Sequence, residues 1–170
     1  MPFIPPPLEP STRQLRLPSK LHNHITPNPL CPHVLATDRF TQWLMPYGIT
    51  KLNEASHLFP THEIIRCCLT MANSILPSTL SNYSSGLAHF TKFCDDFNVP
   101  KDSCMLASEV MLPMCISNRA AGSVIKSTMQ TWVEGLQLWH VINDTPWQGG
   151  SALSHTLKVC QSDPPPHISY

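Results

Sequence analysis

The placement of proline limits where this chain can fold. Half of its 18 prolines lie within the first 35 residues, and Pro164, Pro165 and Pro166 stand near its end. Proline fixes φ and has no backbone N–H to donate, so dense proline excludes helices and central strands. We therefore predict a disordered proline-rich arm over residues 1–35 and a mostly disordered tail over residues 148–170.

Charge, hydrophobicity and cysteine usage exclude several classes of protein. Eleven Lys and Arg balance eleven Asp and Glu, so no net positive field draws polyanions to the surface. The first residues lack the pattern of a signal peptide, and no apolar run is long enough to span a bilayer. The seven cysteines include no C-x-x-C pair, and their odd number argues against a disulfide framework. We expect an intracellular protein without membrane partners, nuclear if it binds DNA and otherwise cytoplasmic.

The segment from Ser78 to Phe97 has the clearest helical pattern. Its apolar residues recur at alternating spacings of three and four, which places them on one face of a helix. This face contains Leu80, Tyr83, Leu87, Phe90, Cys94 and Phe97. The positions left facing outward are Ser81, Asn82, Ser85, His89, Lys92 and Asp96. Pro100 closes the segment, because a residue before proline is disfavoured in the helical region.

A second long helix is predicted before Asn143. It begins at Ser123 or, more consistently with the pattern, at Ser127, where Ser127 and Gln130 have the spacing of a capping box. Its apolar face contains Met129, Trp132, Val133, Leu136, Trp139 and His140. Its outward positions are Gln130, Thr131, Glu134 and Gln137. The two apolar faces need each other, so we predict that Leu87, Phe90, Trp132 and Leu136 are buried.

Three further helical segments have weaker signals. Thr61 is a candidate cap for a helix over residues 61–75, and Ser108 for one over residues 108–119. Pro113 would kink the latter unless the helix begins near Leu112. A short fifth helix is possible over residues 152–159. No segment alternates with period two, so the predicted class is all-α, a four- to five-helix bundle.

The sequence contains no complete catalytic or metal-binding motif. His62-Glu63 begins like the zinc motif H-E-x-x-H, but Arg66 occupies the last position. Ser123 and Lys126 match S-x-x-K without the other elements of that enzyme class. The few glycines form no phosphate-binding loop. We expect no enzyme activity, no cofactor and no metal.

Two blocks of sequence carry a family resemblance. The first contains Pro77, Ser78, Thr79, Tyr83, Phe90, Phe93 and Cys94. It resembles the second helix of the core-binding domain of phage-type tyrosine recombinases. The second contains Ala121-Gly122-Ser123, Ser127-Thr128-Met129, Trp132, Leu136, Trp139-His140, Asn143 and Pro146-Trp147. It resembles the fourth helix of that domain and the turn that follows.

A third block precedes these two. It contains Cys31 to Ala36, Asp38-Arg39-Phe40, Trp43, Pro46 and Tyr47. It resembles the segment before the core-binding domain in recombinase-like proteins of mushroom-forming fungi, which mobile elements commonly encode. The resemblance spans roughly residues 30–150. It implies a lead-in segment over residues 36–60 and a SAM-like core-binding domain over residues 61–147.

In that family the core-binding domain grips one side of a DNA duplex, and a separate domain cleaves the strand. This chain ends about twenty residues after Trp147, which leaves no room for the catalytic domain. The resemblance implies that the two long helices contact DNA through their outward residues. These are Ser81, Asn82, Ser85 and His89, followed by Lys126, Ser127, Gln130 and Thr131. The implied partners are double-stranded DNA and either a second copy or a separate catalytic domain.

The charge of this segment supports an alternative. Between Pro77 and Asn143, four Lys or Arg oppose five Asp or Glu. Glu134 and Gln137 also stand where family members tend to have serine and arginine. Because phosphate neutralisation supplies most non-specific affinity, DNA binding should be weak. The alternative is a helical protein-interaction module, or a degenerate or domesticated remnant that no longer binds DNA.

Overall fold

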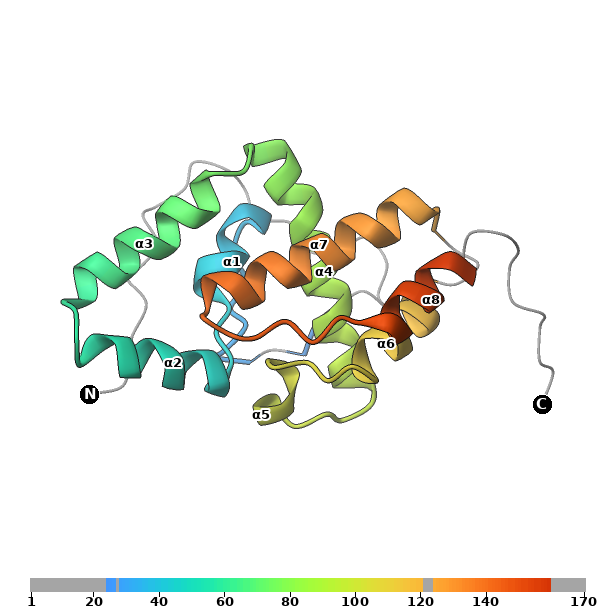
Figure 1. Cartoon of the computed structure of the whole chain (residues 1–170), viewed down its shortest axis with the longest axis horizontal. Coiled ribbons are helices and arrows are strands. Elements are labelled where there is room, and N and C mark those ends of the chain that lie inside the picture. The colour runs from blue at the N-terminus through green and yellow to red at the C-terminus, as the bar shows by residue number, and fades with distance from the viewer. Residues whose placement is uncertain (1–23, 27, 121–123, 160–170) are drawn as a thin grey trace.

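A computed structural model describes residues 24–26, 28–120 and 124–159. Within these ranges the chain forms helices and no β-strand, apart from an isolated bridge between Asn28 and Cys31, which confirms the all-α class. In chain order these elements are η2 (Ala36–Asp38), α1 (Arg39–Gln42), α2 (Pro46–Ser56), α3 (Thr61–Asn73), α4 (Pro77–Asp96), α5 (Lys101–Cys104), α6 (Met111–Arg119), α7 (Lys126–Ile142) and α8 (Ser151–Val159) (Figure 1). None of the helices described is long and apolar enough to cross a membrane.

The two longest helices, α4 and α7, cross at the centre of the molecule and share its largest helix–helix interface (Figure 1). Two glycines allow this close approach. A Cβ atom on Gly86 would collide with the backbone of Trp132, and one on Gly135 would collide with the backbone of Tyr83. The two backbones therefore touch, which fixes the relative position of the helices.

The core lies around this crossing. Leu87 and Phe90 are fully buried, and Trp132 and Leu136 are 5% and 2% exposed, as predicted. Phe97 departs from the predicted apolar face, because it is 55% exposed. The reason is that α4 ends at Asp96, so Phe97 already belongs to the turn.

Both long helices end in the same kind of turn. Asn98 and Asp144 have φ angles of 52° and 51°, and the next residue donates a hydrogen bond back into the helix. The Val99 N–H donates to Cys94 O, and the Thr145 N–H donates to His140 O. This is the Schellman arrangement, in which Asn and Asp tolerate the left-handed backbone better than most residues. The predicted ends near residues 97 and 143 are therefore confirmed.

The predicted helix starts are less accurate. The Ser127 capping box is wrong, because α7 begins at Lys126 after Ile125 and has no side-chain cap. Thr61 is the first residue of α3 and not its cap. Ser108 is not the N-cap of α6, which begins at Met111 after Val110, although the Ser108 Oγ accepts from the Met111 N–H at 3.2 Å. Pro113 then falls in the first turn, where its missing N–H costs no helical hydrogen bond.

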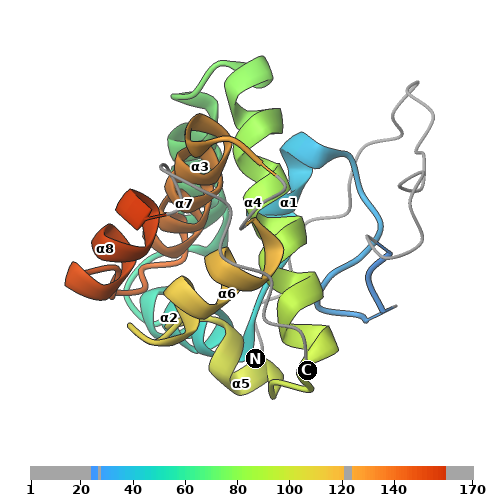
Figure 2. The same cartoon turned by 90° about the vertical axis from the view of Figure 1, so that its right-hand side faces the viewer.

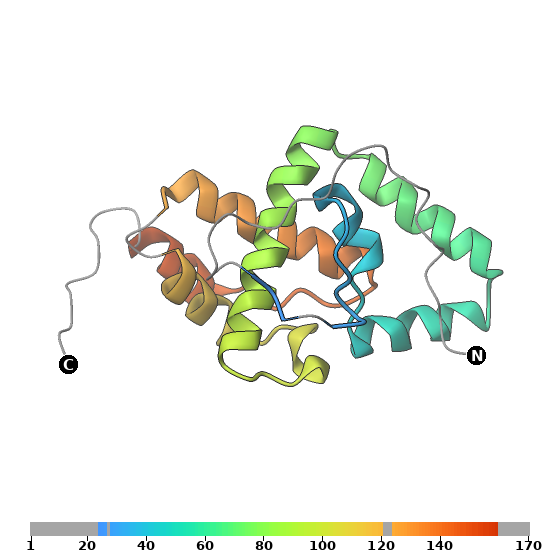
Figure 3. The same cartoon turned by 180° about the vertical axis from the view of Figure 1, so that it is seen from behind.

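The predicted arm and tail are both too long. Cys31 and Val34 are buried, the Leu44 N–H donates to Leu30 O, and Trp43 Nε1 donates to Pro32 O at 2.8 Å. Figure 3 shows this segment passing along α4 toward α1. Apolar residues between the prolines thus dock on the bundle. Beyond residue 148, α8 forms and buries Leu153, while residues 1–23 and 160–170 lie outside the described ranges.

Residues 36–60 carry more structure than a lead-in. They form η2, α1 and α2, and they bury Phe40, Trp43 and Met45 in the main core. Trp139 of α7 donates from Nε1 to Trp43 O at 3.0 Å. The boundary at residue 61 therefore does not separate a domain from its lead-in, because both share one core.

Candidate nucleic-acid interface

A polar depression lies between α4 and the first turns of α7. It is lined by Asn82 and Ser85 from α4 and by Ser127, Thr128, Thr131 and Trp132 from α7. Four of the predicted contact residues, Asn82, Ser85, Ser127 and Thr131, therefore meet at one place. The glycine-mediated crossing brings them together, because it holds the two outward faces beside each other.

The predicted residues on α7 continue this surface outward. Lys126, Ser127 and Gln130 are exposed, and Thr131 is half-buried. The Thr131 hydroxyl donates to Ser127 O at 2.8 Å, so its oxygen remains an acceptor toward the depression. On α4, Asn82 is exposed, while Ser81 and Ser85 are half-buried. Lys126, Gln130 and Ser81 do not line the depression and can meet only a ligand that extends beyond it.

His89 has a different setting from the one expected. Its ring stacks on Trp132 with a centroid separation of 3.8 Å, and Arg119 donates to its Nδ1 from Nη2 at 2.9 Å. Because arginine is only a donor, Nδ1 must be the unprotonated nitrogen of this ring. His89 therefore links α4, α6 and α7 and supports the site, with Nδ1 committed within the protein.

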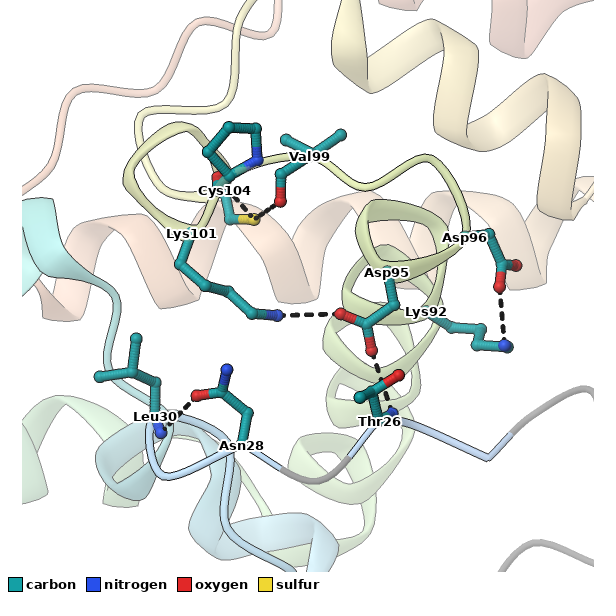
Figure 4. Close-up of polar contacts among 10 residues, drawn as sticks. Thr26, Asn28, Leu30, Lys92, Asp95, Asp96, Val99, Lys101 and Cys104 are labelled. Atoms are coloured by element: carbon teal, nitrogen blue, oxygen red, sulfur yellow. Dashed lines mark hydrogen bonds and ion pairs between the residues drawn. The ribbon is translucent and has the colours of Figure 1, made fainter.

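The charges around the site are sparse. Lys92 pairs with Asp96 at 2.7 Å, and Lys101 pairs with Asp95 at 3.0 Å (Figure 4). The second oxygen of Asp95 accepts from the Thr26 N–H, so this carboxylate also holds the segment before α1 (Figure 4). These two lysines are thus neutralised by their own carboxylates. Lys126 is left as the exposed cation on the α7 side of the depression.

Glu134 contributes a negative charge beside these residues. It is exposed on α7, one turn after Gln130. A hydrogen bond to Glu134 raises the pKa of Tyr83, so the carboxylate is partly engaged by α4. Glu134 therefore both joins the two helices and opposes a polyanion at this face.

The described residues offer no metal centre. No group of three His, Cys, Asp or Glu in the described ranges could hold an ion. Burial raises the pKa of Cys31 to about 11 and that of Cys115 to about 12, which keeps both thiols protonated at neutral pH. These buried thiols behave as small apolar side chains and not as nucleophiles.

Two residues of this region were missed at the sequence level. Thr128 lines the depression. Its spacing of three from Thr131 and four from Trp132 puts it on the same face of a helix, and this spacing could have identified it. Arg39 approaches α4 from α1, where Nη1 donates to Ser84 Oγ at 3.1 Å. No sequence pattern indicates that contact, because the two residues are 45 positions apart.

Comparison of the chain with family profiles, with curated proteins and with solved structures found no match. The chemistry of the site must therefore be inferred from its own residues. What these offer is a rigid polar surface of hydroxyls and amides, with one exposed lysine and one exposed glutamate.

Proposed function

We propose that this chain is a DNA-binding domain of the tyrosine-recombinase core-binding type, which grips duplex DNA through α4 and α7. One observation carries the proposal. Asn82 and Ser85 from α4 meet Ser127 and Thr131 from α7 around one depression, on two helices whose backbones touch. The sequence resemblance assigns DNA contact to these same two helices.

The chemistry of the surface suits a duplex. Amide side chains such as Asn82 and Gln130 can bond to base edges, and hydroxyls can bond to bases or phosphates. Lys126 supplies a phosphate contact at the start of α7. Because the glycines fix the crossing, these groups are held in position before DNA arrives, which lowers the entropic cost of binding.

In this proposal the domain binds DNA and does not cleave it. Strand cleavage would then require a separate catalytic domain, supplied by another chain or by a longer form of this one. A nuclear location follows from DNA as the partner. We expect that the purified chain does not nick supercoiled plasmid. Nicking activity that a single point substitution abolishes would contradict this expectation.

The test is duplex binding by fluorescence anisotropy at two salt concentrations. Lys126→Ala should weaken binding to all sequences and reduce the slope of log K against log salt by about one unit. Asn82→Ala and Gln130→Ala should change sequence preference instead. Lys158→Ala on α8 is the matched control, because Lys158 is exposed and lies outside the proposed face.

Glu134→Gln gives a test of opposite sign. Removing the carboxylate should tighten binding, most at low salt, because the repulsion of phosphate is screened by ions. The amide can still bond to Tyr83, so the α4–α7 contact is preserved. If none of these substitutions changes affinity, the proposal fails.

A second candidate is a helical protein-interaction module. Leu58 and Phe59, in the turn between α2 and α3, are 79% and 60% exposed. Phe97 and Met114 are also exposed, beside an apolar hollow between the end of α4 and α6. Exposed apolar surface of this kind marks binding sites for other proteins. Absence of salt-dependent DNA binding would favour this candidate.

A further inference from the structure

Arg39 is a half-buried cation for which the described residues supply no carboxylate partner. Its Nη1 donates to Ser84 O at 3.2 Å and to Ser84 Oγ at 3.1 Å. Its guanidinium carbon lies 5.1 Å from the centroid of the Trp43 ring. These contacts hold the side chain in place, but none of them supplies a negative charge.

Four other cations, unlike Arg39, form hydrogen bonds to carboxylates. Lys51, Arg66, Lys92 and Lys101 each pair with a carboxylate, whereas no carboxylate in the described part of the chain lies within ion-pair distance of Arg39. Its Nε is buried and has no acceptor there. Burial lowers the pKa of Arg39 and raises that of the adjacent Asp38, so both groups lose hydration without pairing.

An unpaired charge of this kind raises the free energy of the protein without a bound anion. A buried charge is costly unless it is paired, and an arginine remains charged at any physiological pH. An incoming anion at the guanidinium would supply the negative charge that Arg39 lacks. The planar guanidinium suits phosphate in particular, because two of its N–H groups can bond to two oxygens at once.

The position of Arg39 indicates where the phosphate comes from. Ser84, its partner, is the neighbour on α4 of Ser81 and Ser85, two of the predicted contact residues. Figure 2 shows α4 between α7 on one side and α1 on the other, and α4 contacts both. Arg39 therefore lies beside α4 at Ser84, whose own side chain is fully buried.

We propose that Arg39 binds a backbone phosphate of the DNA duplex, which makes α1 the third element of the interface. The inference rests on the proposed function and deepens it. Phosphate contacts then come from two helices that pack on α4, from Lys126 on α7 and from Arg39 on α1. Phosphate contacts fix the register of a protein on the duplex, while other residues meet base edges.

The first experiment measures duplex affinity and its salt dependence in the full chain. Arg39→Gln should weaken binding about tenfold at low salt, as for one lost charge-assisted hydrogen bond, and reduce the salt slope by about one unit. Arg39→Lys should keep the slope and lose only part of the affinity, because it retains the charge without the planar fork. Lys51→Gln, which removes an equal charge from α2, should bind like the wild type.

These variants separate phosphate binding from a purely structural role. If Arg39 served only to hold α1 on α4, Arg39→Lys and Arg39→Gln would lower the melting temperature together and leave the salt slope unchanged. That result overturns the inference. Equal affinity and equal slope for Arg39→Gln and wild type also overturn it, while the proposed function survives through Lys126 and Asn82.

A second measurement follows the binding in the wild-type chain itself. The side-chain Nε–H signal of Arg39 in the 15N-labelled wild-type chain should shift as duplex DNA is added, and Arg39→Lys assigns it by its loss. If the Arg39 signal does not shift although DNA binding is saturable, the inference about Arg39 is overturned and the proposed function is not. If the chain does not bind DNA, the proposed function is rejected and this inference with it. A shift of the Arg39 signal with inorganic phosphate only would then identify a site for the free anion.

Discussion

The α4–α7 crossing and the α2–α3 hairpin are built from similar helical patterns but are packed very differently. At the crossing, Leu87, Phe90, Met129 and Trp139 are fully buried. The hairpin joins a small separate cluster of Leu44, Leu52 and Ile64, and its turn leaves Leu58 exposed. The difference teaches that an apolar face is buried only as far as another face meets it.

Helix α3 shows this most clearly. In the helix predicted over residues 61–75, only Ile64 and Ala72 are buried, and Leu69 is 43% exposed. In α7 nearly the whole predicted face is buried, including His140. The α4–α7 region therefore carries the stability of the bundle and the proposed site, while the hairpin contributes less.

The largest expected effect on stability comes from truncating a core leucine, which we compare at the α4–α7 crossing and at the α2–α3 hairpin. Leu87→Ala should cost about 2 to 5 kcal/mol of unfolding free energy, because it leaves a cavity at the crossing. Leu52→Ala should cost at most about 2 kcal/mol, because half-buried neighbours can close around the site. Urea denaturation measures both. Equal losses would show that the hairpin is as tightly packed as the crossing.

The next effect concerns the glycine contact. Gly135→Ala should destabilise the chain by about 1 to 3 kcal/mol, although alanine is the better helix former, because its Cβ meets the backbone of Tyr83. It should also weaken DNA binding by separating the two polar faces. Gln137→Ala on the exposed side of α7 is the control and should alter neither. Increased stability of Gly135→Ala would contradict the close approach.

Acid should weaken the crossing through His140. This histidine is fully buried, donates from Nδ1 to Leu136 O at 2.8 Å and accepts from the Ala107 N–H at Nε2. Burial lowers its pKa below the ordinary value of 6.5. The unfolded chain therefore binds a proton first, so this contribution to stability is complete above pH 6.5 and is lost as the pH falls toward the folded pKa.

The slope of this loss can reach about 1.4 kcal/mol per pH unit. Denaturation curves between pH 7 and pH 5, about the range in which histidine titrates, provide the measurement. His140→Gln should flatten the dependence, whereas His62→Gln, at an exposed position, should not. The same pH slope in wild type and His140→Gln would show that other groups govern the acid response.

The smallest effect is expected at the hairpin turn. Leu58→Ser and Phe59→Ser should each change the unfolding free energy by about 0.5 kcal/mol or less, because neither side chain is buried. Neither should change duplex affinity. Loss of a bound protein partner with unchanged stability would instead support the interaction-module candidate.

The sequence pattern predicts the long helices well and the ends of the molecule poorly. The repeat of Leu80, Leu87 and Cys94 predicts burial correctly because another helix packs on that face. Asn98 and Asp144 end their helices through local backbone geometry. The packing of Cys31 and Val34 has no periodic signal, since it depends on single apolar residues between prolines. Local propensity is silent about such long-range docking.

The site was predictable only in part, for a similar reason. Helical spacing identifies Asn82, Ser85, Ser127 and Thr131 as outward-facing, and the crossing then joins them. The stacking of His89 on Trp132 and the approach of Arg39 to Ser84 depend on tertiary contacts between distant segments. Spacing along one helix cannot reveal either contact.

The central claim is that the α4–α7 crossing presents the DNA-binding face, and backbone amide NMR during titration with duplex DNA tests it most directly. We predict that the shifted signals fall in residues 81–89, in residues 126–131 and beside Arg39, whereas those of the α2–α3 turn stay in place. Saturable shifts confined to the hairpin, or no shifts at all at low salt, would contradict the account.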